Sequence, residues 1–245
     1  MSGESIWVDE LEQFYADGWI GSVLHTVKGG KEATVYCCTS GPKIDAQLVA
    51  AKVYRPRMYR DFKNDSVYQE GRVILHSRLR RAVRKKTKAG RGCQFGMWVE
   101  AEFETLSALH KAGADVPRPY TRSPNTVLME YVGDSEMAAP PLRYVRIDPG
   151  EARGLFECLM RNVELWLSCN CVHGDLSPFN ILYWNGDVKV IDFPQAVDPR
   201  FNRNARDLLT RDVENVCAYF RQYGMEPDAQ QIVWDLWTRF RYAVL

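Results

Sequence analysis

The 245-residue sequence lacks any run of about 20 apolar residues, which is the length that a membrane-spanning helix needs. Its N-terminal stretch, MSGESIWVDELEQFYADG, carries acidic residues where a secretory signal peptide requires an apolar core. Internal repeats and low-complexity stretches are also missing. These absences predict a cytoplasmic protein without membrane contact, and the length suits one large domain or two tightly joined lobes.

The cysteines do not form a recognisable framework. There are seven, an odd number, and none are spaced as Cys-x-x-Cys or accompanied by histidine at ligand spacing. This pattern argues against a disulfide scaffold and against a structural zinc site. We expect free thiols in a reducing compartment.

Charge is nearly balanced overall, at +1, but it is unevenly distributed. Residues 55–92 hold 13 of the 32 lysines and arginines and only three acidic residues. This basic segment predicts a possible RNA contact, because lysine and arginine bind phosphates, and its tyrosines could stack on bases. The alternative is a solvated helix face or lid. Nothing in the sequence indicates DNA sequence readout.

The first half of the chain is rich in predicted strands. Apolar and polar residues alternate on both sides of Gly29-Gly30, which predicts two strands joined by a glycine turn. QLVAAKVYRP predicts a third strand, and the segment before Gly133 predicts a fourth. Helical spacing over 98–114 predicts a helix, whereas the glycine-rich residues 88–96 are expected to be flexible.

The second half is predicted to be mainly helical. Helices are expected over 149–169 and from about 203 onward, with a hairpin between them at Asn185-Gly186. We therefore predict an α+β fold with two lobes, residues 1–132 and 133–245, around a cleft. The first lobe would contain a mixed sheet, and the second would be mainly helical and truncated.

The strongest chemical signal is VHGDLSPFNILYWNGDVKVIDF, residues 172–193. It spaces Asp175, Asn180 and Asp192 along a loop, a hairpin and a second loop. Magnesium prefers oxygen ligands, so Asn180 and Asp192 are predicted to bind it together with nucleotide phosphates. Asp175 would remain free to accept the proton of an attacking hydroxyl. The spacing matches the catalytic loop of protein kinases, and Asp192 occupies the position of the metal-binding aspartate.

The first half supplies candidate nucleotide ligands. Lys52 lies in VAAKV, as does the phosphate-binding lysine of kinases. Glu102 could pair with it, although Glu100 and Glu104 are competitors. The backbone of the glycine turn could approach phosphates, and the segment around Met129, Tyr131 and Val132 could hold adenine by its backbone groups. We predict ATP and Mg²⁺ as cofactors.

Five segments resemble the RIO family of atypical serine/threonine protein kinases, over residues 20–220. They are GGKEATVY, FKNDSVYQEGR, WVEAEFETL, the 172–193 string and NARDLLTRDVENV. The resemblance implies that Gly29, Gly30, Lys31 and Glu32 form the nucleotide loop and favours Glu102 over its neighbours. It also implies a kinase or ATPase linked to small ribosomal subunit maturation, with a protein substrate or ribosomal particle as partner.

The resemblance further implies a minimal, bacterial-type member without the winged-helix domain that some members have. In some members the metal-loop aspartate, here Asp192, is thought to receive the phosphoryl group. Two other functions stay open. One is a small-molecule phosphotransferase of the aminoglycoside or choline kinase type, which shares the H-G-D-x-x-x-x-N pattern. The other is an RNA- or ribosome-binding scaffold that uses nucleotide as a switch.

Overall fold

The computed structural model describes residues 8–30, 32–55 and 88–245. The described residues fall into two compact units. The first contains residues up to 55 together with 88–104 and 117–138, and the second contains 105–116 and 139–245. The predicted boundary after Val132 stays a prediction. Lys31 and residues 56–87, which carry most of the basic segment, lie outside the described residues.

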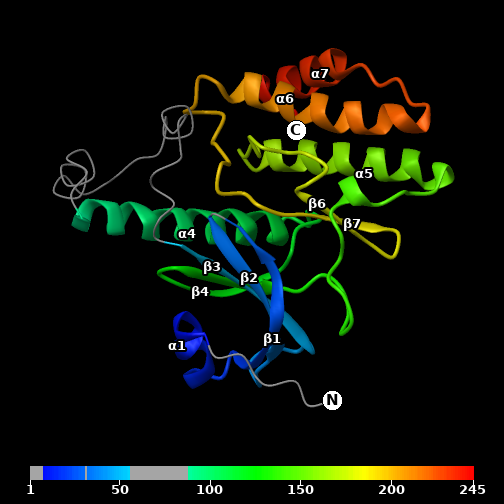
Figure 1. The fold of residues 1–245 in the computed structure, drawn as a ribbon. Coiled ribbons are helices and arrows are strands. Elements are labelled where there is room, and N and C mark those ends of the chain that lie inside the picture. The colour runs from blue at the N-terminus through cyan, green and yellow to red at the C-terminus, as the bar shows by residue number, and fades with distance from the viewer. Residues whose placement is uncertain (1–7, 31, 56–87) are drawn as a thin grey trace. The chain divides into compact units, whose positions relative to one another are not determined.

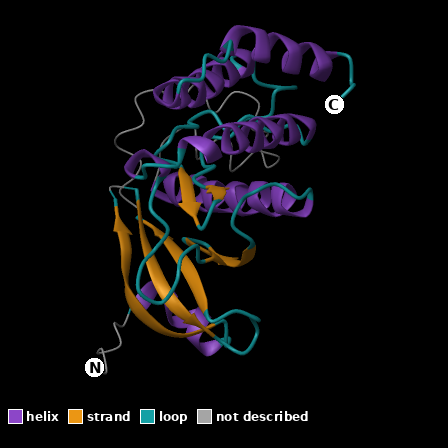
Figure 2. Ribbon diagram, turned by 90° about the vertical axis from the view of Figure 1, so that its right-hand side faces the viewer, coloured by secondary structure: helices purple, strands orange, loops and turns teal. Residues whose placement is uncertain are grey.

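The first unit is built on a five-stranded sheet in the order β1-β2-β3-β5-β4 (Figures 1 and 2). One face of the sheet, including Val49, Ala51 and Val53 of β3, is buried in a core cluster with Leu11 and Phe14 of a short helical segment near the N-terminus. The elements of this unit are η1 Asp9–Leu11, α1 Glu12–Ala16, β1 Ile20–Gly29, β2 Ala33–Ser40, β3 Leu48–Tyr54, β4 Pro119–Ser123 and β5 Thr126–Glu130.

The sheet is antiparallel at every described strand pair, so the prediction of a mixed sheet is wrong. The physical reason is the connections: β1–β2 and β4–β5 are hairpins, and a tight turn joins only antiparallel strands. Sequence reasoning missed β4 because its proline-bounded residues indicate a turn. Pro119 is tolerated there because it begins an edge strand.

Helix α4, Lys88–Lys111, begins well before the predicted start at Trp98. The glycine-rich residues 88–96 are helical, so the expectation of a flexible stretch is wrong. Helix formation is cooperative, and the later turns are fixed by burial of Val99, Glu102 and Leu106. That packing offsets the cost of about 1 kcal/mol per glycine. The helix ends before Gly113, whose φ of 90° suits glycine.

The second unit is mainly helical, as predicted (Figure 1). Its helices pack on one another through apolar faces, and Phe156 of α5 meets Phe220 of α6 edge to face at 5.5 Å. The Asp148 side chain caps α5 by accepting the Gly150 N–H at 2.7 Å. The elements are η3 Leu142–Tyr144, α5 Pro149–Ser168, α6 Ala205–Phe220, η4 Arg221–Tyr223 and α7 Ala229–Arg241. Among the described residues, no helix combines the length and apolarity needed to cross a membrane.

The predicted hairpin is present in the second unit as β6 Ile181–Trp184 and β7 Asp187–Val190. Asn185 and Gly186 have φ values of 50° and 89°, as a type I′ turn requires. Because Ile181 pairs with Val190, the hairpin brings the residues just before β6 beside those just after β7. It thereby joins Asn180 to the loop that carries Asp192.

Candidate functional site

Lys52 and Glu102 form an ion pair inside the first unit. The Lys52 ammonium lies 2.7 Å from Glu102 Oε1, and the Glu102 side chain is only 1% exposed. Register fixes Lys52 between Val35 and Val127 in the middle of the sheet. Of the three candidate glutamates, Glu100 instead pairs with Arg122, and Glu104 is exposed. The expected pairing is therefore present, while the role in nucleotide binding stays a prediction.

The predicted nucleotide loop lies at the end of β1. The Gly30 N–H donates to the Ala33 carbonyl at 2.9 Å, so the turn itself uses that group. Gly29 has open space where a Cβ would lie, which leaves room beside the backbone. The Glu32 side chain is exposed, and its carbonyl accepts the Arg55 N–H at 2.8 Å. Lys31 is outside the described residues.

The predicted adenine-binding residues lie at the end of β5 of the same unit, with Met129 in the strand and Tyr131 and Val132 just after it. Met129 and Tyr131 are buried, and Val132 is half-buried. Burial raises the pKa of Tyr131 to about 12, with Cys37 as the next cause, so its hydroxyl stays protonated at neutral pH. Their contact with a nucleotide stays a prediction.

The catalytic loop of the second unit is built around buried His173. Its Nδ1 accepts the Asp175 N–H at 3.2 Å, and its Nε2 lies 3.1 Å from the Ile191 carbonyl. This pattern defines a neutral ring with the proton on Nε2. The ring also packs on Phe193, with 4.5 Å between centroids. His173 therefore connects the backbone of the Asp175 loop to that of the Asp192 loop.

The structure brings together the three residues predicted to perform the chemistry. The Asn180 amide donates to the Asp175 carbonyl at 2.9 Å, and the Asn180 carbonyl accepts the Ile191 N–H at 2.9 Å. Desolvation raises the pKa of the accessible Asp175 carboxyl, and the nearby Asp192 carboxylate raises it further. Arg211 and the Asn180 amide act in the opposite direction. The Asp192 carboxylate is therefore close enough to Asp175 to affect its pKa.

Asp192 adopts a left-handed backbone, with φ of 73°. Such a conformation is uncommon for a residue other than glycine, and aspartate and asparagine tolerate it best. This conformation turns the chain shortly after the end of β7. The next residue, Phe193, is buried. Within the described part of the chain, no three His, Cys, Asp or Glu side chains form a metal cage. A magnesium site here would therefore depend on Asn180, Asp192 and oxygens from a ligand.

Helix α6 holds the catalytic loop from behind, a role that the sequence analysis did not assign. The buried Asp212 carboxylate accepts the N–H groups of Gly174 at 2.7 Å and Leu176 at 2.8 Å. Arg211 donates to the Gly174 carbonyl, and Asn215 donates to the Leu176 carbonyl at 2.9 Å. Burial raises the pKa of Asp212 to about 7. The sequence did contain a signal for this role, namely the polar residues repeated along NARDLLTRDVENV. An aspartate is rarely buried in a helix unless another group binds it, so Asp212 indicates a bonding partner.

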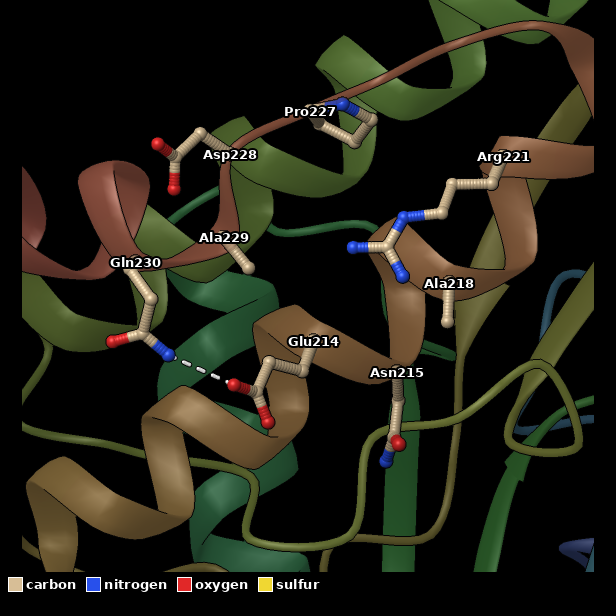
Figure 3. Close-up of a pocket in the computed structure, with 8 residues that line it drawn as sticks. All are labelled: Glu214, Asn215, Ala218, Arg221, Pro227, Asp228, Ala229 and Gln230. Carbon is tan, nitrogen blue, oxygen red and sulfur yellow. Dashed lines mark hydrogen bonds between the residues drawn. The ribbon is translucent and has the colours of Figure 1, made fainter.

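A groove of about 570 Å³, which Asn215 helps to line, lies between α6 and the start of α7 (Figure 3). In Figure 3 the Arg221 side chain extends over this groove, and the Gln230 amide donates to Glu214 at 2.8 Å. The three catalytic candidates are not among its lining residues. The groove therefore belongs to the packing of α6 against α7 and not to the catalytic residues described above.

An antiparallel sheet with a lysine–glutamate pair, and a helical unit with an Asp-x-x-x-x-Asn loop followed by a hairpin and an aspartate, together define a protein-kinase-like fold. The Rio2 kinase of Chaetomium thermophilum, solved as an ADP/Mg²⁺-phosphoaspartate complex, matches 91% of this chain and 64% of its own. The TM-score is 0.65 at 22% sequence identity. The predicted fold class is thus confirmed.

Residues 34–232 match the profile of the RIO domain, and the chain belongs to the RIO family. The RIO-type serine/threonine-protein kinase Rio1 of Haloferax volcanii is 33% identical over 217 residues, which cover 88% of this chain and 69% of that protein. The serine/threonine-protein kinase rio1 of Schizosaccharomyces pombe is 31% identical over 209 residues. Those residues cover 84% of this chain but only 39% of the yeast protein.

Proposed function

We propose that this chain is an ATP- and magnesium-dependent phosphotransferase that acts on serine or threonine hydroxyls of a protein. The observation that carries this proposal is the convergence of Asp175, Asn180 and Asp192 on a loop held from behind by Asp212. Membership of the RIO family supports the same reaction. Phosphoryl transfer needs positioning and charge neutralisation more than covalent chemistry, and a rigid loop provides the first.

The residues fit a magnesium ion. The Asp192 carboxylate raises the pKa of Asp175, and two carboxylates this close favour a cation beside them. Asn180 and Asp192 would hold the ion, which when bound neutralises the developing charge on the phosphates. In the first unit Lys52, fixed by Glu102, would bind nucleotide phosphates.

Asp175 would act as the general base. Its raised pKa moves it toward the operating pH, where a base that accepts a hydroxyl proton is most effective. Asp175 is exposed in its loop, which leaves the carboxylate accessible to an acceptor. His173 and Asp212 keep the backbone of this residue in place.

A second candidate is an ATPase in which Asp192 itself receives the phosphoryl group. The phosphoaspartate in the Chaetomium complex favours it, as does the unusual backbone of Asp192. One experiment distinguishes the two: incubation with labelled ATP and magnesium, followed by mass spectrometry of the protein and of its products. Phosphate on serine or threonine indicates the kinase. A hydroxylamine-sensitive acyl phosphate on Asp192, hydrolysed by water to release inorganic phosphate, indicates the ATPase. Transfer to aminoglycosides or choline instead would indicate the small-molecule alternative.

We also propose a ribosomal particle or its proteins as the partner, with RNA contact through residues 55–92. The charge of that segment supports this. Changing Arg80, Arg81, Arg84, Lys85 and Lys86 together to alanine should weaken RNA binding about tenfold or more at low salt, with a smaller effect as salt rises. Basal ATP turnover is the control. Equal RNA affinity of the mutant and wild type would contradict an RNA-binding role.

A further inference from the structure

Two aromatic side chains stand exposed beside the catalytic loop. Tyr144 is 73% exposed and Phe179 is 47% exposed, and their rings meet edge to face at 5.9 Å and 72°. Phe179 lies in the same short loop as Asp175 and directly precedes Asn180. Large apolar side chains in such positions usually bury against something, since exposure of paired aromatic rings gives up favourable transfer free energy.

The pair is held rigidly. The Arg143 N–H donates to the Pro178 carbonyl at 3.0 Å, which ties the Tyr144 segment to the Phe179 segment. The buried Tyr219 hydroxyl donates to the Leu142 carbonyl at 2.9 Å, and the Tyr183 N–H donates to Pro140 at 3.0 Å. The Asn180 N–H closes a turn on the Ser177 carbonyl at 2.9 Å. Both rings are therefore presented by fixed backbone, which limits the ordering cost of binding.

We propose that Tyr144 and Phe179 form a recognition site for the peptide that carries the acceptor hydroxyl, and that this site takes a large apolar side chain of that peptide. The proposal rests on the proposed function and names the substrate class. Phe179 is four residues from Asp175, and an extended chain advances about 3.3–3.6 Å per residue. The Cα atoms of Asp175 and Phe179 are therefore at most about 13–14 Å apart, a span that three to four residues of extended peptide also cover.

The surrounding charge selects the type of peptide. Arg143 and Arg146 are exposed on the same segment as Tyr144. They complement acidic side chains on the peptide beyond the apolar residue. The rings cross at 72° and so offer no parallel platform for successive bases, which favours a peptide over single-stranded RNA at this position.

The test uses the full chain and serine-centred peptides that differ only in phenylalanine, leucine or alanine at each flanking position, on an acidic background. We expect wild type to prefer the apolar peptide to its alanine counterpart by about tenfold in kcat/KM at one position. In Tyr144→Ala the ratio should fall to near one, mainly through KM. The ratio is internal to each variant, so a change in folded fraction cancels. Phe179→Leu, which retains an apolar side chain, should keep a reduced preference.

Tyr242→Ala is the matched control, because Tyr242 is 76% exposed on another element. It should leave the ratio unchanged. The inference is overturned if wild type phosphorylates itself but shows no apolar preference, if the preference survives in Tyr144→Ala, or if oligouridine competes for the pair. Absence of any magnesium-dependent transfer from ATP, to the protein or to peptides, would overturn both this inference and the proposed function.

Discussion

The two units hold their functional groups by different physical means. In the first unit Lys52 lies in a central strand, and one ion pair to the buried Glu102 orients its side chain. In the second unit Asp175, Asn180 and Asp192 lie in loops, and the fixed parts are backbone groups bonded to His173, Asp212 and Asn215. The charge in the sheet is therefore held by a buried charge of opposite sign, whereas the loops are held by a network of hydrogen bonds to their backbone.

This difference has consequences for mutation. A residue whose partner is buried and charged cannot be removed without a stability cost, because the partner is left uncompensated. A residue that is itself accessible and supported through its backbone can lose its side chain with little effect on folding. A mutation of the functional residue in the first unit should therefore lower both activity and stability. A mutation in the second unit should lower activity with little change in stability.

Asp192 offers the largest effect and the clearest separation. Asp192→Asn should lower magnesium-dependent ATP turnover by about 10³-fold, because a charged ligand at the phosphates is lost. Its stability should change little, since asparagine tolerates the φ of 73°. Asp192→Ala should lose the same activity and in addition about 1 kcal/mol of unfolding free energy from backbone strain. Steady-state turnover and urea denaturation measure both. Wild-type turnover in either variant would remove Asp192 from the site.

Asp175 should affect transfer without affecting nucleotide binding. We expect Asp175→Ala to reduce transfer by about 10²–10⁴-fold, the contribution of a positioned base. ATP affinity, measured by calorimetry with magnesium, should stay within about threefold of wild type. A fall in affinity without a fall in transfer per bound ATP would mean that the roles of Asp175 and Asp192 are exchanged.

The same contrast explains what could be predicted from the sequence. Lys52, Asp175, Asn180 and Asp192 follow a local spacing, and the Asn185-Gly186 turn fixes how the hairpin aligns them. Residues that act over long separations give no such spacing. Asp212 reaches Gly174 across 38 positions, and its partners are backbone N–H groups that the sequence does not display. The strand β4 and the early start of α4 were missed because prolines and glycines were weighed locally, whereas tertiary packing decided both.

The Lys52–Glu102 pair should show coupled loss in the first unit. Lys52→Met leaves the Glu102 carboxylate buried without its ammonium, which should cost about 3–5 kcal/mol of unfolding free energy. The double variant Lys52→Met, Glu102→Leu should recover much of that stability but no nucleotide turnover. Denaturant titrations of both variants provide the measurement.

The control for this pair is an exposed ion pair that joins the same helix, α4, to strand β4. Arg122 and Glu100 form an ion pair with side chains 34% and 45% exposed. Arg122→Met should change stability by less than about 1 kcal/mol, because exposed pairs contribute little. If the two methionine variants were equally stable, the buried pair would be no more constrained than a surface pair, and the contrast between the units would fail.

Asp212 should give the smallest effect on turnover, and its main consequence should be a pH dependence of stability. Burial is the first cause of its raised pKa of about 7, while the two backbone N–H groups and Arg211 lower it. A carboxyl group with a higher pKa in the folded state than in the unfolded state binds a proton on folding. Its contribution to stability is therefore fully present below about pH 4 and is lost as pH rises to about 7. Within that window the unfolding free energy should fall by up to ~1.4 kcal/mol for each pH unit.

Asp212→Asn cannot titrate, so its unfolding free energy should lack this slope, and Asp207→Asn, an exposed position on the same helix, should retain it. Catalytic turnover of Asp212→Asn should fall only modestly, by about tenfold, because one side-chain oxygen remains to accept a backbone N–H while its amide faces the other donor. Denaturant titrations between pH 4 and pH 8 measure the slope. Equal slopes for Asp212→Asn and wild type would mean that the two N–H bonds and Arg211 outweigh burial and that the loop is held by a permanently ionised carboxylate. The loop in the second unit would then be held by a side chain that stays charged across this pH range, as Lys52 is held in the first unit.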